Sequence, residues 1–175
     1  MKIKAFTIIT TGMVLSTAAI ADNTIRFQGE VAAQTCSINI NGSASSPLVL
    51  LPTVATSSLA ATGSTAGQTP FTISLTGCTA PTEATAVSTV FVGNNLTEAG
   101  RMVNTGTATN VSLQLVDPAS PTTPLDLTGQ MGAPGLSLAI DATTASHDFA
   151  VQYYAEGAAT PGSVLSSVQY SVSYQ

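Results

Sequence analysis

The chain ends in a stretch with the alternating pattern of a β-strand, which reads Val164-Leu165-Ser166-Ser167-Val168-Gln169-Tyr170-Ser171-Val172-Ser173-Tyr174-Gln175. From Val164 onward every second residue is apolar or aromatic, with Ser166 as the exception, and most residues between them are polar. Successive side chains of a strand point to opposite faces, so this pattern predicts one face in a core and one in water. Nothing follows this strand to pair with its outer edge, and we expect that edge to be open.

Two further segments have the same alternation. Just before the last strand, Phe149, Val151, Tyr153 and Ala155 share one parity, and Gly157–Gly162 connects the two segments. Near the other end, a strand is expected at Ile25–Val31. Its apolar face consists of Ile25, Phe27, Gly29, Val31 and Ala33. This strand either pairs within its own domain or completes the open edge of a neighbouring copy, and the residue pattern by itself allows both.

The rest of the chain also has the pattern of strands rather than helices. Val-, Ile- and Thr-rich runs alternate with short turn clusters rich in Gly and Pro, and no long stripe of helical period is present. Several short strands at this spacing predict one β-sandwich domain, most simply immunoglobulin-like. The expected strands are Ile25–Val31, Cys36–Ile40, Pro70–Cys78, Ala86–Val92, Val111–Val116, Leu136–Ile140, His147–Ala155 and Val164–Tyr174. The expected loops include residues 42–47, 60–68, 79–84, 93–100 and 118–124.

The composition excludes several classes of function. Only 7% of the 175 residues are charged, and 44% are hydrophobic. Lys2 and Lys4 lie in a predicted signal peptide, which leaves Arg26 and Arg101 as basic residues against 9 acidic ones. So few cations cannot neutralise a row of phosphates, which excludes nucleic-acid binding. Binding to an anionic membrane surface is excluded for the same reason. One His and two Cys leave few groups from which to build a catalytic or metal site, and we expect no enzyme activity, no metal site and no cofactor.

The first residues have the pattern of a secretory signal peptide. Lys2 and Lys4 precede the apolar run Ala5–Leu15, and Ala19-Ile20-Ala21 supplies a small–x–small cleavage pattern. We therefore expect residues 1–21 to be removed and the exported chain to begin at Asp22. In an exported protein, Cys36 and Cys78 most simply form a disulfide, which indicates an oxidising compartment such as a periplasm.

Taken together, these features resemble one family, the chaperone–usher fimbrial subunits of the type 1 major-subunit kind. The matching residues are Thr24-Ile25-Arg26-Phe27-Gln28-Gly29-Glu30-Val31, the pair Cys36 and Cys78, and the ending Val168-Gln169-Tyr170-Ser171-Val172-Ser173-Tyr174-Gln175. The resemblance implies an incomplete immunoglobulin-like sandwich that lacks its last strand, so that a hydrophobic groove stays open. A donor strand from a neighbouring subunit would complete it.

The resemblance also implies domains, partners and site residues. Residues 22–34 would be a donor-strand extension and residues 35–175 the pilin domain. The donor face would be Asn23, Ile25, Phe27, Gly29 and Val31. The acceptor groove, edged by the strand after Cys36 and by the last strand, would use Val164, Val168, Tyr170, Val172 and Tyr174, which would also contact a chaperone. A periplasmic chaperone would deliver the subunit to an outer-membrane usher, where copies would join head to tail with each other and with other fimbrial subunits.

The expected function is therefore that of a structural subunit of an adhesive fimbria on the bacterial cell surface. A minor or tip-proximal adaptor subunit is the first alternative, and a glycan-binding module the second. Tip adhesins carry an additional lectin domain, for which the mature chain has no room.

Overall fold

The computed structural model describes residues 36–45 and 47–174. Within this part of the chain, strands account for most of the regular structure, and the single helix is a short 3₁₀ turn. The elements are β1 (Ser37–Ile40), η1 (Thr56–Leu59), β2 (Thr65–Thr76), β3 (Thr85–Gly93), β4 (Met102–Val103), β5 (Val111–Val116), β6 (Thr128–Leu138), β7 (Ala145–Ala155) and β8 (Val168–Tyr174).

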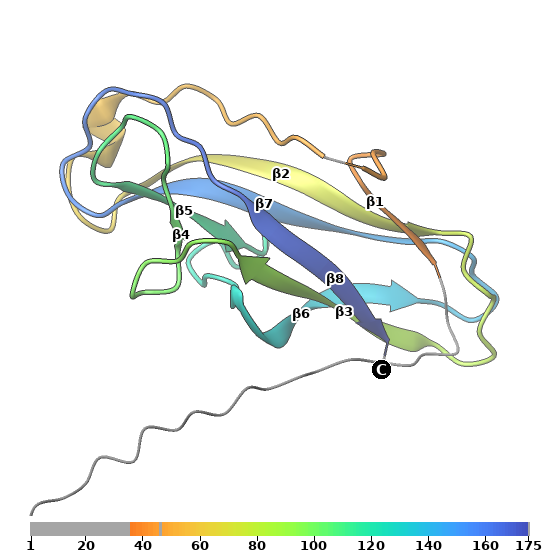
Figure 1. The fold of residues 1–175 in the computed structure, drawn as a ribbon. Coiled ribbons are helices and arrows are strands. Elements are labelled where there is room, and N and C mark those ends of the chain that lie inside the picture. Colours follow the sequence, from red (N-terminus) through yellow and green to blue (C-terminus); the bar gives the residue numbers. More distant parts are fainter. Residues whose placement is uncertain (1–35, 46, 175) are drawn as a thin grey trace, which may run out of the picture.

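The strands form two antiparallel sheets that lie one over the other (Figure 1). The larger sheet has the order β1-β2-β7-β5-β4, and the smaller sheet has the order β6-β3-β8. This arrangement confirms the predicted all-β, immunoglobulin-like sandwich. β1 and β8 each stand at an edge of their sheet, because β1 pairs only with β2 and β8 pairs only with β3 among the described strands.

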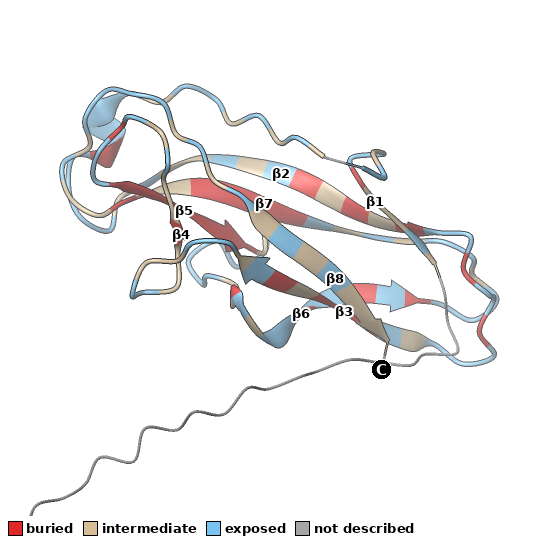
Figure 2. Ribbon diagram, in the orientation of Figure 1, coloured by how far each residue is buried: buried red, intermediate tan, exposed pale blue. Residues whose placement is uncertain are grey.

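Three phenylalanines tie the two sheets together at the centre of the core. Phe71 on β2 and Phe149 on β7 belong to the larger sheet, and Phe91 on β3 belongs to the smaller one. The ring of Phe91 meets both others edge-on, with centroids 6.5 Å from Phe71 and 5.3 Å from Phe149. Edge-to-face pairs add about 0.5–1.5 kcal/mol each to the burial of the rings. Figure 2 shows the buried residues concentrated along β2, β5, β7 and β3.

The last strand begins at Val168 rather than at the predicted Val164. The residues before it follow the loop after β4 instead of continuing along β3. Ala108 N donates to Ser163 O at 3.0 Å, and Thr105 N donates to Leu165 O at 2.8 Å. Gly106 and Gly162 permit this close approach, because a Cβ atom at either position would collide with the opposing backbone.

Other boundaries also differ from the prediction. β2 begins at Thr65, inside a stretch that was expected to be loop, and accommodates a bulge between Ala66 and Thr69. β6 begins at Thr128, well before the predicted start at Leu136. The sequence does not reveal this earlier start, because a strand rich in glycine has no clear alternation. β4 and η1 were not predicted, since both are too short to show a period. The expected strand Ile25–Val31 and the predicted boundaries at residues 21 and 34 lie outside the described residues.

The disulfide between Cys36 and Cys78 is present, as predicted. It joins the residue before β1 to the loop after β2, and the two cysteines are 42 positions apart in the sequence. Among the described residues, no helix is long and apolar enough to cross a membrane.

Replacing both cysteines, Cys36→Ser with Cys78→Ser, should lower the free energy of unfolding by about 4 kcal/mol, because the closed loop restricts the unfolded chain. Denaturant titration of the oxidised protein and the double variant measures this difference. Fully reduced wild-type protein should unfold as the double variant does. Free thiols in the purified, non-reduced protein would contradict the role assigned to this bond.

Candidate functional site

The core is open along one side of the sandwich. A cavity of about 210 Å³, here called the groove, lies between the segment Pro47–Leu51, which follows β1, and the segment Ser166–Tyr170, which contains the start of β8. Its remaining lining comes from side chains of the core and of β1, namely Ile40, Phe71, Phe91, Met102, Leu113, Leu115 and Val151. The groove therefore gives access to the apolar interior between the two sheets.

The wall at Pro47–Leu51 has the side-chain alternation of a strand but no strand partner. Val49 and Leu51 pack against the core, whereas Leu48 and Leu50 are 76% and 77% exposed. No backbone hydrogen bond connects Leu48–Leu51 with another described residue. In Figure 1 this run crosses from β1 toward η1 as an irregular connection. Its N–H and C=O groups are thus available to an added strand.

The residue pattern does not predict this wall. The strand after Cys36 is predicted to edge the groove, but only Ile40 of β1 reaches it. A signal was present, because Leu48–Leu51 is a short apolar run bounded by Pro47 and Pro52. That signal was too short to be separated from a loop.

The predicted acceptor residues divide into three groups. Val168 and Tyr170 line the groove. Val172 and Tyr174, further along β8, are half-buried and pack against the core without lining the groove. Val164 lines a second cavity, described below. The predicted donor residues Asn23, Ile25, Phe27, Gly29 and Val31 lie outside the described residues.

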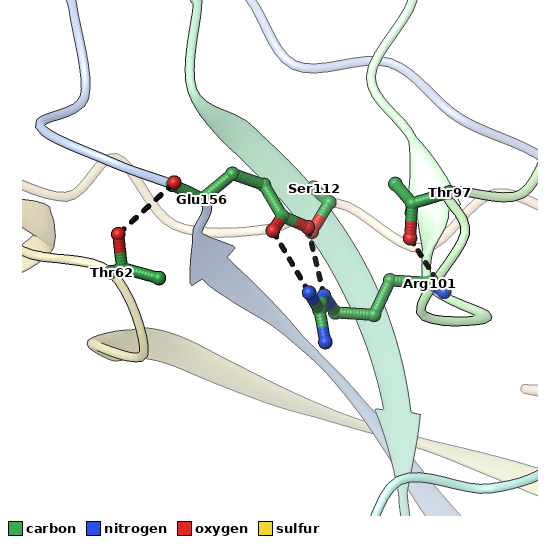
Figure 3. A network of polar contacts seen from close by, with 5 residues as sticks. All are labelled: Thr62, Thr97, Arg101, Ser112 and Glu156. Carbon is green, nitrogen blue, oxygen red and sulfur yellow. Dashed lines mark hydrogen bonds and ion pairs between the residues drawn. The ribbon is translucent and has the colours of Figure 1, made fainter.

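A polar cluster fixes the region around Arg101, which is the single Lys or Arg among the described residues (Figure 3). Arg101 donates to both carboxylate oxygens of Glu156, from Nε and from an Nη atom, each at 2.8 Å. Ser112 Oγ donates to the same carboxylate at 2.7 Å, and the guanidinium lies 3.8 Å from the ring centroid of Tyr154. The hydrogen bond from Arg101 is the largest cause that lowers the pKa of Glu156 and raises that of Arg101.

His147, the one histidine of the sequence, packs against an aromatic ring of the core. The ring of His147 contacts the ring of Phe149 edge-on with centroids 4.7 Å apart, and its Nε2 lies 3.4 Å from Asp117 Oδ2. Its sequence neighbour Asp148 points the other way and accepts a hydrogen bond from Thr72 Oγ1 at 2.6 Å. Within the described residues, no group of three or more His, Cys, Asp or Glu side chains is arranged to hold a metal ion.

Comparison with known proteins agrees with this geometry. The model of the family described as fimbrial protein matches residues 25–175. The chain belongs to this family. It is 37% identical to the major fimbrial subunit SMF-1 of Stenotrophomonas maltophilia (strain K279a), over 88% of this chain and 93% of the relative. It is 38% identical to the F17 fimbrial protein of Escherichia coli, over 91% of this chain and 92% of the relative.

The fold agrees with a solved fimbrial structure as well. The P pilus rod subunit PapA superposes with a TM-score of 0.58 at 13% identity, over 80% of this chain and 99% of that one. The fimbrial subunit described here is thus a structural component of cell-surface fimbriae, where it associates with other fimbrial subunits.

The ion pair makes the stability of the fimbrial subunit depend on acid. Because the pKa of Glu156 is lowered in the folded state, its contribution is complete above the ordinary pKa of 4.5 and is lost as pH falls through the lowered value. Glu156→Gln should lower the free energy of unfolding by on the order of 1–2 kcal/mol at pH 7, because it breaks a half-buried, hydrogen-bonded charge pair.

Melting curves between pH 2 and pH 7 test this assignment. The difference between the wild-type protein and Glu156→Gln should shrink toward the acid end. Some acid sensitivity should remain in the variant, because hydrogen bonds from Thr128 also lower the pKa of Asp126. A difference that stays constant over this range would contradict the assignment.

Proposed function

We propose that this fimbrial subunit polymerises by donor-strand exchange, in which the N-terminal segment of one copy fills the groove of the next. The donor segment would be residues 22–34, with Asn23, Ile25, Phe27, Gly29 and Val31 directed into the groove. The observation that carries the proposal is the open, apolar groove between two strand-like walls, Pro47–Leu51 and β8.

Both walls have backbone groups that could pair with an added strand. Leu48–Leu51 has backbone groups without partners among the described residues, and β8 is an edge strand of its sheet. A strand inserted between them could form main-chain hydrogen bonds on both sides, while its alternate side chains enter the apolar interior. Each fully buried Ile, Phe or Val of the donor would contribute about 1.5–3 kcal/mol.

The same proposal accounts for export and delivery. Residues 1–21 would direct the chain into the periplasm, where the disulfide can form. A subunit with an open groove would tend to aggregate there, because its apolar cleft is exposed. A periplasmic chaperone would cover the groove until an outer-membrane usher exchanges it for the donor strand of the next subunit. The repeated head-to-tail contact does not close, so it builds a filament.

A synthetic peptide of residues 22–33 should raise the melting temperature of the monomeric mature chain, because it binds the folded state and not the unfolded one. At a hundredfold excess over its dissociation constant the gain should be about 2.7 kcal/mol. A peptide of the same composition in scrambled order is the control. Equal melting temperatures with the two peptides would overturn the proposal.

Gly29→Leu should allow folding and chaperone binding but slow fibre assembly by at least about tenfold. Gly29 is the one position on the donor face without a side chain, and a leucine there would strike the groove floor. Gln28→Ala, on the opposite face, should have little effect. Assembly followed by electron microscopy and by the rate of polymer formation distinguishes them. Normal assembly by Gly29→Leu would contradict the proposed donor register.

A further inference from the structure

A second cavity of about 260 Å³ adjoins the groove beyond the start of β8, and Leu51 lines both. One wall of the second cavity is formed by Thr53–Thr56, which continues the wall Pro47–Leu51. The other wall is formed by Ala159–Val164, which precedes the wall Ser166–Tyr170. The same two segments thus border both cavities in succession, so a strand lying in the groove and continued in its own direction would reach the second cavity.

The second cavity has an apolar base and carries no charge. Leu59, Ala108 and Val111 in its lining are buried and form a hydrophobic cluster of their own with Ala155. None of the residues around the cavity is charged, and the polar ones are mostly threonines. The cavity is thus open with a mixed lining, polar around its rim and apolar at its base, and its volume leaves room for a small aliphatic side chain against that base.

Hydrogen bonds hold both walls of the cavity in place. Tyr153 Oη donates to Pro52 O at 3.2 Å, which anchors the first wall. The ring of Tyr153 packs closely over Gly67, where an added Cβ would lie 2.8 Å from Cδ2. The second wall is fixed by the hydrogen bond from Ala108 N to Ser163 O. A preformed cavity loses little conformational freedom when it is filled.

The direction of the donor strand follows from how a chain of copies can grow. Figure 1 places the start of β1 and the end of β8 at the same end of the sandwich. A donor parallel to β8 would bring the next copy's Cys36 to that end, where this copy's own donor segment also leaves. An antiparallel donor brings the next copy to the opposite end, so that the two neighbours do not compete and the line extends. Every strand pair in the described residues is also antiparallel.

The antiparallel register then determines what reaches the second cavity. If the five donor residues face β8 from Tyr174 backward, Gly29 lies opposite Val168 and Ala33 lies opposite Val164. Val164 lines the second cavity. The chain from Val31 to Cys36 can span at most about 17 Å, so residues 32–35 have to pass along this end of the acceptor.

We propose that the donor segment extends beyond Val31 and that Ala33 of the incoming copy occupies the second cavity. This inference rests on the proposed donor-strand function and specifies a further contact within it. An alanine leaves most of 260 Å³ unfilled. The contact between copies is therefore weaker at this point than the cavity allows, and a larger apolar residue at position 33 would strengthen it.

Synthetic donor peptides test the proposal on the monomeric mature chain. The peptide 22–35 should dissociate more slowly than 22–31, and the same peptide with Ala33→Ile should dissociate at least about tenfold more slowly again, because three further carbons are buried. The matched control is Ala32→Ile, whose side chain has the opposite parity and should change the rate little.

A variant of the acceptor locates the effect. Ala159 lines the second cavity and is partly exposed, so Ala159→Leu should fill the cavity without disturbing the groove. In this variant the peptide 22–31 should bind as before, while the advantage of 22–35 and of Ala33→Ile should disappear. Fibres of the full chain with Ala33→Ile should likewise dissociate in hot detergent at a higher temperature than fibres with Ala32→Ile.

The outcomes separate the two proposals. If 22–31 stabilises the chain but 22–35 and Ala33→Ile add nothing, the inference is wrong and donor-strand exchange stands. If neither peptide stabilises the chain, donor-strand exchange itself is wrong. A gain from residues 32–35 that persists in Ala159→Leu means that these residues bind outside the cavity, which also overturns the inference.

Discussion

The opening in the core between Pro47–Leu51 and β8 is the constraint on which the rest of this molecule depends. Buried apolar side chains normally stabilise a domain because water is excluded from all sides of the core. Here Phe71, Phe91 and their neighbours line a groove that water can enter. A single copy therefore lacks part of the hydrophobic stabilisation that a closed core would provide. In the proposed donor-strand exchange, the incompleteness that weakens a single copy would drive successive copies to associate.

An open core requires the remainder of the sandwich to hold its shape without the missing layer. Three features of the sandwich serve this purpose. The edge-on contacts of Phe91 with Phe71 and Phe149 join the sheets at their centre. The disulfide ties β1 to the end of β2, and the pair Arg101–Glu156 fixes the residues next to β4, β5 and β7. Each acts on a different region of the sandwich.

The charge distribution also fits an assembled subunit. The sequence has 9 acidic residues against 4 basic ones, so copies of the chain carry like charge and repel one another. The one Lys or Arg among the described residues is already paired with Glu156. Ionic attraction between copies is therefore a poor source of cohesion. Apolar burial and main-chain hydrogen bonds remain, and neither is weakened much by salt. Among the described residues, the groove between Pro47–Leu51 and the edge strand β8 offers both.

The sequence by itself determined the fold class, the disulfide and the inward-facing residues of the last strand. These features follow from the alternation at Val168–Tyr174, from two cysteines in an exported chain and from the near absence of charge. The tertiary structure alone decided which segments border the groove. Pro47–Leu51 becomes a wall only because β1 ends at Ile40 and the chain then crosses the open side. Val164 leaves β8 because Gly106 and Gly162 let two distant loops touch. Alternation records which face of a segment is buried, but not which distant segment lies against it.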